Sequence, residues 1–373
     1  MFEKLNLKFK GVNFNKDKDI STVKNEEFNL PLVNAKDGSN GIMYYGRQKD
    51  FDYAEMTIDI VSDGAISTGN VYPQPQKTGV LYNAYLIKSK FSISENILNF
   101  FASSIYKSIK PKFGYDNKAV WVRVKKEKIE LPTKNNQIDF DFMESFVAEL
   151  EAQRVAELDA YLNVTGLKDY KLNDEEINAI DNLEKVKWHE FKMGDLFERI
   201  KTKKLPYKAK ELPKEPKDNY KLPLLTSSFM NQGLNYYAPE KNATVLKNVI
   251  SIPSNSDVYR SYYQSREFTV LSDAYAIEWK NKEIELSPNG YLFAVSCINK
   301  VTDLPIYSYK NKLGGWNVVK NKYVKLPVDS NGEIDFNYME NLTQAIKKLV
   351  IKDVVKYSDR KLETTKEVVK HAR

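Results

Sequence analysis

The chain has 373 residues, of which 42% are hydrophobic and 29% charged. This composition is typical of a folded protein with about two or three domains and excludes a disordered chain. The net charge of +7 favours a polyanionic partner, and the single cysteine, Cys297, excludes a disulfide framework within the chain. Residues Met1–Lys8 lack the apolar run of a secretory signal, so we expect a cytoplasmic protein.

A β-rich region is predicted first, up to about residue 135. Runs of β-branched and aromatic residues, such as Thr57–Val61 and Ala119–Val124, are typical of strands. One helix is expected over Glu95–Tyr106, where apolar residues recur at helical spacing. Strands and helices do not alternate as they do in parallel sheets, so the region is predicted to be an α+β globule.

A long amphipathic helix is predicted next, over residues 138–162. Ile138, Phe142, Phe146 and Leu150 begin a stripe of apolar residues, and the outer face is acidic. Gly166 lies just beyond the expected end of this helix. A shorter surface helix is expected over residues 173–186.

The second half of the chain repeats this order of elements. It opens with Trp188-His189-Glu190-Phe191-Lys192-Met193-Gly194-Asp195-Leu196-Phe197, continues with a second β-rich region, and ends in an amphipathic helix that includes Met339. The outer face of that helix is basic. Opposite charges favour pairing of the two long helices as a coiled coil, although each helix could instead pack on its own domain.

Short matches in the same order identify an internal duplication. Leu30-Pro31-Leu32 returns as Leu222-Pro223-Leu224, an offset of 192 (222 − 30). Ile138-Asp139-Phe140 returns as Ile334-Asp335-Phe336, an offset of 196 (334 − 138). A repeat of this length is a whole domain with an attached helix, and two such domains usually pack about a pseudo-two-fold axis.

This order, with the Trp188–Phe197 opening and the Leu-Pro and Ile-Asp-Phe closings, resembles the specificity subunits of type I restriction–modification systems. The resemblance covers essentially the whole chain. It implies an α+β fold with two similar target-recognition domains, separated by two long helices that form an antiparallel coiled coil. The implied segments are residues 1–135 and 187–332 for the recognition domains, with residues 136–186 and 333–373 as helical spacers.

One departure from the family pattern concerns the first domain. It has no clear counterpart of Trp188–Phe197, because the chain begins at Met1-Phe2-Glu3-Lys4. Either the strand has diverged there or the N-terminus is short.

The resemblance also implies a non-catalytic subunit that reads a bipartite, asymmetric site in double-stranded DNA. Two methyltransferase subunits, and in some systems restriction–translocase subunits, would be its partners. No cofactor is expected on this chain, because S-adenosylmethionine, and ATP with Mg²⁺, would be bound by the partners.

Candidate DNA-reading residues are amide, hydroxyl, cationic and aromatic side chains in regions expected to be exposed loops. In the first domain they are Lys36, Ser39, Asn40, Tyr44, Arg47, Asn70, Tyr72, Gln74, Gln76, Lys77, Lys112, Asn117 and Lys118. In the second domain they are Ser227, Ser228, Asn231, Asn255, Tyr259, Arg260, Tyr262, Tyr263, Gln264, Arg266, Lys310 and Lys312. The strongest stretches are Ser67–Lys77 and Ser254–Arg266, and a solvated loop position is the alternative for each residue.

Candidate residues for the coiled coil or for partner binding lie on the apolar stripes of the two long helices. They are Phe142, Phe146, Leu150 and Leu158 on the first helix, and Leu342, Ile346, Leu349 and Val354 on the second.

Signatures of catalysis are weak in this sequence. It has no nucleotide-binding or methyl-donor fingerprint and only two histidines, which argues against an enzyme or a metal site. One alternative is a free-standing nuclease in which Asp181, Glu190 and Lys192 would serve a Mg²⁺ ion. Another is a scaffold that does not bind DNA. Cys297 lies in an apolar run and is expected to be a buried side chain.

Overall fold

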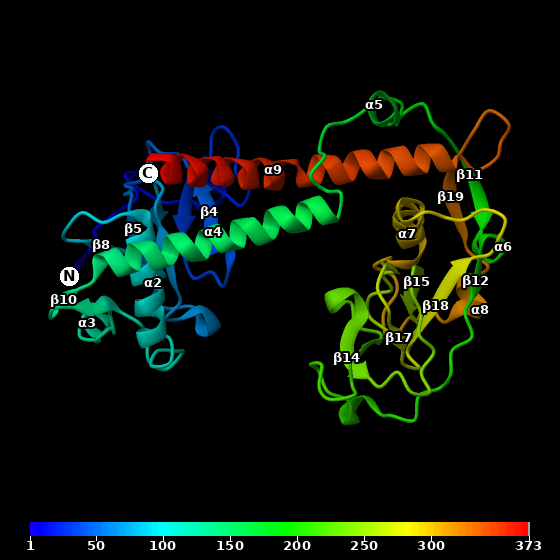
Figure 1. The fold of residues 1–373 in the computed structure, drawn as a ribbon, viewed down its shortest axis with the longest axis horizontal. Coiled ribbons are helices and arrows are strands. Elements are labelled where there is room, and N and C mark those ends of the chain that lie inside the picture. The colour runs from blue at the N-terminus through cyan, green and yellow to red at the C-terminus, as the bar shows by residue number, and fades with distance from the viewer. Residues whose placement is uncertain (372–373) are drawn as a thin grey trace. The chain divides into compact units, whose positions relative to one another are not determined.

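The computed structural model describes residues 1–371. They form two compact units, one of Met1–Ala160 with the C-terminal residues from Ser358, and the other of Tyr161–Tyr357. Two long helices, α4 (Phe140–Val164) and α9 (Phe336–His371), each contribute to both units (Figure 1). The globular part before α4 is called the first domain, and that between α4 and α9 the second.

The first domain contains two four-stranded sheets. One sheet is antiparallel and has the strand order β1-β8-β5-β6. The other has the order β2-β4-β3-β7, and its strands β3 and β7 are parallel. The strands are β1 (Phe2–Lys4), β2 (Ile20–Ser21), β3 (Leu30–Val33), β4 (Ile42–Gly46), β5 (Thr57–Val61), β6 (Val71–Gln74), β7 (Gly79–Val80) and β8 (Ala84–Ser89). The predicted strand over Thr57–Val61 is therefore confirmed.

Helix α2 (Glu95–Ile109) packs on the antiparallel sheet. Ser94 caps it by accepting a hydrogen bond from the backbone N–H of Ile97 at 3.2 Å. Its buried face includes Leu98 and Phe101, which contact Ile58 and Ile60 of β5 in one core. The helix predicted over Glu95–Tyr106 is confirmed and runs one turn further.

The remaining elements of the first domain are short. They are α1 (Lys16–Asp19), η1 (Ser39–Gly41), η2 (Ala65–Ser67), α3 (Trp121–Val124), β9 (Thr133–Lys134) and β10 (Gln137–Ile138). The strand predicted over Ala119–Val124 is wrong. Trp121 packs edge-on against Tyr85 and Val124 is buried, a three-residue spacing that one helical turn satisfies and a strand does not.

The second domain repeats this architecture, except that its smaller sheet has three strands and no counterpart of β2. Its sheets have the orders β12-β18-β15-β16 and β14-β13-β17, and β13 pairs with β17 in parallel as β3 does with β7. The strands are β12 (Phe197–Arg199), β13 (Leu222–Leu225), β14 (Leu234–Ala238), β15 (Val249–Pro253), β16 (Tyr262–Gln264), β17 (Thr269–Val270) and β18 (Ala274–Trp279). The helices are η3 (Ala209–Glu211), η4 (Met230–Gly233), α7 (Pro288–Thr302) and α8 (Trp316–Val319).

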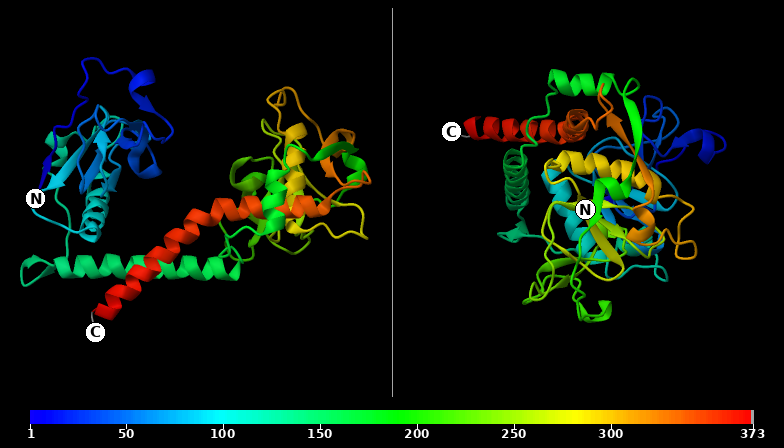
Figure 2. Two further views of the ribbon diagram at one scale, coloured as in Figure 1. Left: turned by 90° about the horizontal axis from the view of Figure 1, so that it is seen from above. Right: turned by 90° about the vertical axis from the view of Figure 1, so that its right-hand side faces the viewer.

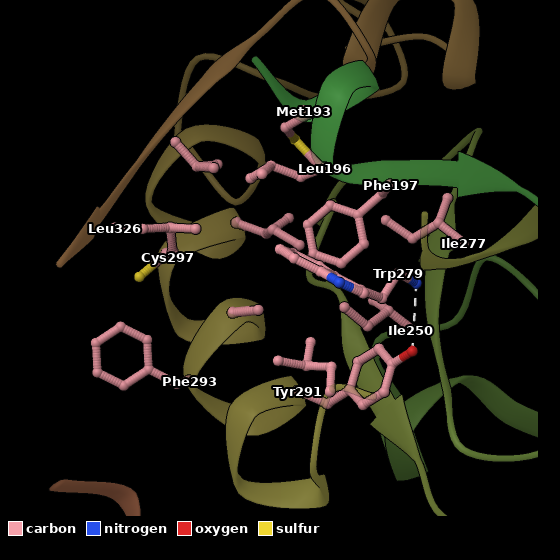
Figure 3. Close-up of a cluster of buried hydrophobic side chains, with 14 of the residues drawn as sticks. Met193, Leu196, Phe197, Ile250, Ile277, Trp279, Tyr291, Phe293, Cys297 and Leu326 are labelled. Atoms are coloured by element: carbon pink, nitrogen blue, oxygen red, sulfur yellow. Dashed lines mark hydrogen bonds between the residues drawn. The ribbon is translucent and has the colours of Figure 1, made fainter. Parts of the chain in front are cut away.

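A block that precedes β12 is present only in the second domain among the described residues. It consists of α5 (Asp174–Asp181), β11 (Lys187–Lys192) and α6 (Met193–Leu196), and β11 pairs antiparallel with β19 (Tyr323–Val328). The surface helix predicted over residues 173–186 is thus confirmed in a shorter form. Figure 3 shows Met193 and Leu196 of this block beside Phe197 and Leu326 in the core of the second domain.

Along the two long helices, the structure buries other residues than those predicted for the seam. Helix α9 is continuous through all of its 36 residues (Figure 2). Within the first unit, α4 and α9 are joined by an ion pair between Glu151 and Lys361 at 2.6 Å. Phe142, Phe146 and Leu150 remain 44–47% exposed, so the structure does not bury them in a seam between the helices.

The other predicted seam residues also lie elsewhere. Leu342 is buried in the core of the second domain, because its turn of α9 packs on that domain. Leu158 is half-buried, whereas Ile346, Leu349 and Val354 are exposed. The division of the chain into four functional segments stays a prediction.

Candidate nucleic-acid interface

The first candidate loop connects β3 to β4 and has an unusual backbone. Four consecutive residues, Gly38, Ser39, Asn40 and Gly41, have φ between 48° and 76°. The left-handed region is costly for residues with a side chain, so Ser39 and Asn40 are held there by their surroundings. A Cβ on Gly41 would lie 2.4 Å from Oδ2 of Asp59, which leaves room only for glycine.

Strand β6 holds this loop by hydrogen bonds. The amide of Gln74 donates to the carbonyl oxygen of Asn40 at 2.7 Å, and the amide of Asn40 donates to that of Pro73 at 2.8 Å. The hydroxyl of Tyr72 accepts from the backbone N–H of Gly38 at 3.0 Å. The side chains of Ser39 and Asn40 remain exposed at the tip of a loop whose backbone is fixed.

The second domain builds the matching loop between β13 and β14 in the same way. Asn231, Gln232 and Gly233 have φ of 47°, 55° and 92°. Gln264 of β16 donates to the carbonyl oxygen of Gln232 at 3.0 Å, as Gln74 does to Asn40. The hydroxyl of Tyr262 donates to the carbonyl oxygen of Phe229 at 2.9 Å. Both domains therefore display two exposed residues on a pinned, left-handed turn.

Further loops of the second domain lie beside this turn. The hydroxyl of Ser256 donates to the carbonyl oxygen of Ser227 at 2.9 Å, and Asp257 accepts from the backbone N–H of Tyr309 at 3.0 Å. These residues line one shallow cavity of about 290 Å³ together with Ser228. Three stretches that the sequence proposed separately, around residues 227, 255 and 310, thus form one surface.

The first domain also gathers its predicted loops. Lys118 forms an ion pair with Asp63, and Asn70 donates to Asp37 at 2.8 Å. The ammonium of Lys110 donates to the carbonyl oxygen of Thr68 at 3.0 Å, and its burial lowers the pKa of that ammonium. Residues 36–40, 62–70 and 112–118 are therefore neighbours at one end of the first domain.

The exposed side chains available for DNA contact can now be separated from the buried ones. The exposed candidates are Ser39, Asn40, Gln76, Lys77, Lys112, Asn117, Lys118, Asn231, Arg260, Arg266, Lys310 and Lys312. The half-buried candidates are Lys36, Tyr72, Ser227, Ser228, Asn255, Tyr262, Tyr263 and Gln264.

For four of the predicted DNA-contact residues, the expected exposure on a loop is wrong. Tyr44, Asn70, Gln74 and Tyr259 are 7%, 4%, 0% and 1% exposed. The stretch Ser67–Lys77 is not a free loop, because Val71–Gln74 is strand β6 and its polar side chains serve the loop beside it. In Ser254–Arg266, likewise, Tyr262–Gln264 is strand β16.

Arg47 is committed to protein carboxylates. Its guanidinium pairs with Asp19 at 3.1 Å, Glu27 at 3.0 Å and Asp50 at 2.5 Å, and only 19% of its side chain is exposed. The hydrogen bond that Arg47 donates to Asp50 raises the pKa of its guanidinium, against the opposing effect of burial. Arg47 therefore stabilises the fold around its own loop. Arg260 also pairs with a carboxylate, Asp303, at 2.7 Å, but half of its side chain is exposed.

Comparison with known proteins supports the duplicated architecture. A family model described as the type I restriction modification DNA specificity domain matches residues 7–160 and 185–357. The chain belongs to this family. Membership confirms the sequence resemblance, the α+β fold with two similar domains and the role in DNA sequence recognition. As a specificity subunit the chain is non-catalytic, and its partners are DNA and a methyltransferase.

Two individual proteins extend this comparison. The chain is 22% identical over 262 residues to the specificity subunit S.BcgI of the type II restriction enzyme BgcI from Heyndrickxia coagulans. The aligned residues cover 70% of this chain and 70% of that subunit. It is similar in fold to the S subunit of a type I restriction–modification system from M. genitalium. That match has a TM-score of 0.53 and 16% identity, and it covers 99% of this chain and 94% of the other.

Two surface residues of this specificity subunit were missed by the sequence reasoning. Phe229 and Met230 stand beside the pinned turn of the second domain and are 49% and 62% exposed. Apolar side chains at the tip of a polar loop can contact thymine methyl groups or stacked bases. The signal in the sequence was an apolar pair inside the polar run Ser227–Gln232.

Residues proposed for the nuclease alternative do not form a catalytic cluster. Glu190 lies on β11 and approaches Lys325 of β19 at 4.0 Å. Among the side chains that the structure describes, no group of three or more histidine, cysteine or acidic residues is arranged to hold a metal ion. Cys297 is buried as expected, and burial raises the pKa of its thiol to about 11. No helix of the described chain is long and apolar enough to cross a membrane.

Proposed function

We propose that this chain reads a bipartite, asymmetric DNA site, one half with each domain, and directs its methyltransferase partners to it. The observation that carries the proposal is the pinned turn, which is built twice, each time with a hydrogen bond from a glutamine of the neighbouring strand, but displays different residues. Ser39 and Asn40 stand at the tip in the first domain, and Asn231 and Gln232 in the second.

Amide side chains on a fixed backbone suit the reading of base edges. Asn and Gln can form two hydrogen bonds with adenine in the major groove, which discriminates it from other bases by ~1–3 kcal/mol. A pinned loop reduces the entropy lost on binding, so more of this energy contributes to specificity. Different tips on the same framework are what two different half-sites require.

Cofactor binding is assigned to the partners in this proposal. We infer two methyltransferase subunits, which bind S-adenosylmethionine, and in a restriction complex further subunits that bind ATP and Mg²⁺. The chain itself would supply DNA recognition and the surfaces on which the partners dock.

The proposal is tested by methylation mapping. The chain is co-expressed with the methyltransferase of its operon, and modified adenines are located by single-molecule sequencing. We expect a split motif with a fixed unread gap. Asn231→Ala should relax or change one half-site and leave the other half unaltered. A contiguous motif, or a change in both halves, would contradict one half-site per domain.

A second candidate follows from the relative in H. coagulans, which is the specificity subunit of a type II restriction enzyme. In that case the chain would read DNA in the same way within a type II assembly. Cleavage by the purified complex with and without ATP separates the two, since a translocating nuclease consumes ATP.

A further inference from the structure

The pinned turn of the second domain carries four consecutive exposed residues of two chemical kinds. Phe229 and Met230 are apolar and are 49% and 62% exposed. The amide side chains of Asn231 and Gln232 follow them directly and are exposed as well. Burial within the domain therefore does not explain the apolar pair Phe229–Met230, which lies on the part of the domain that carries the DNA-reading candidates.

The backbone that presents these side chains is fixed along its length. In addition to the two hydrogen bonds from β16, the N–H of Met230 donates to the hydroxyl of Ser228 at 3.1 Å. The N–H of Thr226 donates to the carbonyl oxygen of Gly233 at 3.0 Å, which closes the base of the turn. An apolar pair held on such a backbone loses little conformational entropy when it contacts a ligand.

The first domain has no such apolar pair on its turn. At the offset of 192 (229 − 37), Asp37 and Gly38 stand at the positions of Phe229 and Met230. The carboxylate of Asp37 accepts a hydrogen bond from Asn70 at 2.8 Å. A feature of the common framework would occur in both turns, so the apolar pair points to a contact that belongs to the second domain alone.

Cations lie at the edges of the surface around this turn. Phe229 lines the shallow cavity of about 290 Å³, together with Ala209 and Tyr309. Ala209 and Tyr309 are each followed in the chain by an exposed lysine, Lys210 and Lys310. Lysines at the edges of a DNA-reading surface suit phosphates, which lie on both sides of a groove.

The centre of the same surface carries negative charge. Asp257 and Asp273 both line the cavity. Asp273 accepts a hydrogen bond from the hydroxyl of Ser227 at 2.9 Å, and Asp257 accepts one from the backbone N–H of Tyr309 at 3.0 Å. Two carboxylates repel phosphate, and the apolar pair offers it no hydrogen bond. Base edges, rather than phosphates, therefore suit the centre of this surface.

The chemistry of the base edges indicates which bases would fit. The thymine methyl group is the apolar group that base edges present in the major groove. Adenine presents an acceptor and a donor there, which one Asn or Gln amide can bond together. An apolar pair followed by two amides on one fixed turn therefore matches thymine and adenine in the major groove.

We propose that the turn of the second domain reads A·T pairs from the major groove. Phe229 and Met230 cover the methyl group of a thymine, and Asn231 bonds an adenine of the same half-site. This inference rests on the proposed function, because it assigns bases to one half of the site.

The test compares duplexes that have thymine or uracil at single positions of the methylated sequence, because uracil lacks only the 5-methyl group. The chain assembled with its methyltransferase is titrated by fluorescence anisotropy. In the half that Asn231→Ala alters, uracil at one thymine should weaken binding about fourfold, the usual effect of one methyl group left in water. In the same half, 7-deazaadenine, which lacks the N7 acceptor, should weaken binding about fivefold, the usual effect of one lost hydrogen bond.

Variants assign these effects to residues. The double change Phe229→Ser with Met230→Ser should weaken binding to the thymine duplex and should bind the thymine and uracil duplexes equally. Both side chains are exposed, so the turn keeps its fold. Asn231→Ala should keep the thymine–uracil difference and lose the effect of 7-deazaadenine. Ile284→Ser, which removes another exposed apolar side chain, is the control and should keep both differences.

Three outcomes would overturn the inference. The first is equal binding of thymine and uracil duplexes by the wild-type chain at every position. The second is a thymine–uracil difference that persists in the double variant, because another side chain would then cover the methyl group. The third is a half-site without A·T pairs. A contiguous methylated sequence would contradict the proposed function instead, and the uracil duplexes would still test the contact of Phe229 and Met230 with thymine.

Discussion

Asp59 lies on β5 under the pinned turn of the first domain, and the matched position of the second domain is Ser251, at an offset of 192. Neither carboxylate oxygen of Asp59 has a hydrogen-bond partner within the part of the chain that the structure describes. Burial raises the pKa of this carboxyl well above its ordinary value. Ser251, in contrast, accepts a hydrogen bond from Gln264 at 2.9 Å.

Asp59→Ser is expected to stabilise the first domain at neutral pH by about 1–3 kcal/mol, the usual cost of a buried unpaired polar group. Because the folded pKa is raised, the folded state binds the proton more tightly, and wild-type stability falls as pH rises above about 4. The variant should lose this dependence. Amide exchange of β5 between pH 5 and 8, corrected for intrinsic rates, measures both effects. Ser251→Asp should destabilise the second domain, and a stable Ser251→Asp protein would contradict the argument.

The sequence predicted the candidate loops better than the candidate residues. Gln74 and Asn40 are both amides in polar stretches that hold the loop, yet Gln74 is buried while Asn40 is exposed at the tip. Composition cannot distinguish these roles, because they depend on which face of β6 meets the turn. Tyr259 was misassigned for the same reason, since a tyrosine between polar neighbours can point into the core.

At the scale of elements, each long helix is fastened to its own domain by an equivalent set of hydrogen bonds. Glu340 of α9 accepts from the capping hydroxyl of Ser287 and from the amide of Asn289, the latter at 2.6 Å. Glu144 of α4 accepts from Ser94 and Asn96 in the same way. Glu340 thus joins the start of α7 to α9, and Glu144 joins the start of α2 to α4.

Glu340→Ala should cost about 1.5–3 kcal/mol, the usual range for a hydrogen bond to a charged group. Asn289 is only 7% exposed and would lose a partner that water cannot readily replace. The effect should appear as faster amide exchange at the start of α7. Glu144→Ala should cost less, because Ser94 is exposed. Glu149→Ala, at an exposed position of α4, is the control, and an equal effect of all three changes would exclude this fastening role.

A buried ion pair joins α5 to α9 in the second unit. Lys348 contacts Glu176 at 3.0 Å and Asp169 at 3.3 Å, and the side chains of Lys348 and Glu176 are 10% and 3% exposed. Burial lowers the pKa of Lys348, but the hydrogen bonds that its ammonium donates to Glu176 and Asp169 outweigh this effect and raise that pKa.

Lys348→Met should destabilise the second unit by about 3–5 kcal/mol, because Glu176 would be left buried without a cation. The double change Lys348→Met with Glu176→Gln should recover part of that loss, since no buried charge remains. Chemical denaturation of the three proteins measures the difference. A single variant as stable as the wild type would show that the pair contributes nothing.

The existence of the helices was predictable from periodicity, whereas the residues that each helix buries were not. The stripe of Phe142, Phe146 and Leu150 correctly indicated an amphipathic helix. The buried side chains of α4, however, are those of Met143, Val155 and Leu162. An apolar stripe does not specify whether a sister helix, its own domain or another polypeptide covers it.

For the whole molecule, comparison of the two duplicated domains distinguishes framework residues from residues that could contact DNA. The salt dependence of binding can then distinguish contacts to phosphates from contacts to bases. Arg266 and Lys310 are exposed cations near the second pinned turn, while Asn231 is an exposed amide at its tip. Contacts between cations and phosphates release counterions, so each should add about 0.9 to the slope of log affinity against log salt. A base contact adds nothing to that slope but discriminates sequences.

Arg266→Ala and Lys310→Ala should therefore weaken binding of the assembled complex to all DNA sequences and reduce the salt slope by about one each. Asn231→Ala should leave the slope unchanged and reduce the preference for the cognate half-site by ~1–3 kcal/mol. Titrations at four salt concentrations, with cognate and scrambled duplexes, measure both quantities. Lys282→Ala is the control, because that lysine pairs with Glu278 at 2.8 Å and Glu198 at 3.5 Å and should not contact phosphate. If all four variants reduced the slope equally, the loops around residues 231, 266 and 310 would not be the surface that meets DNA.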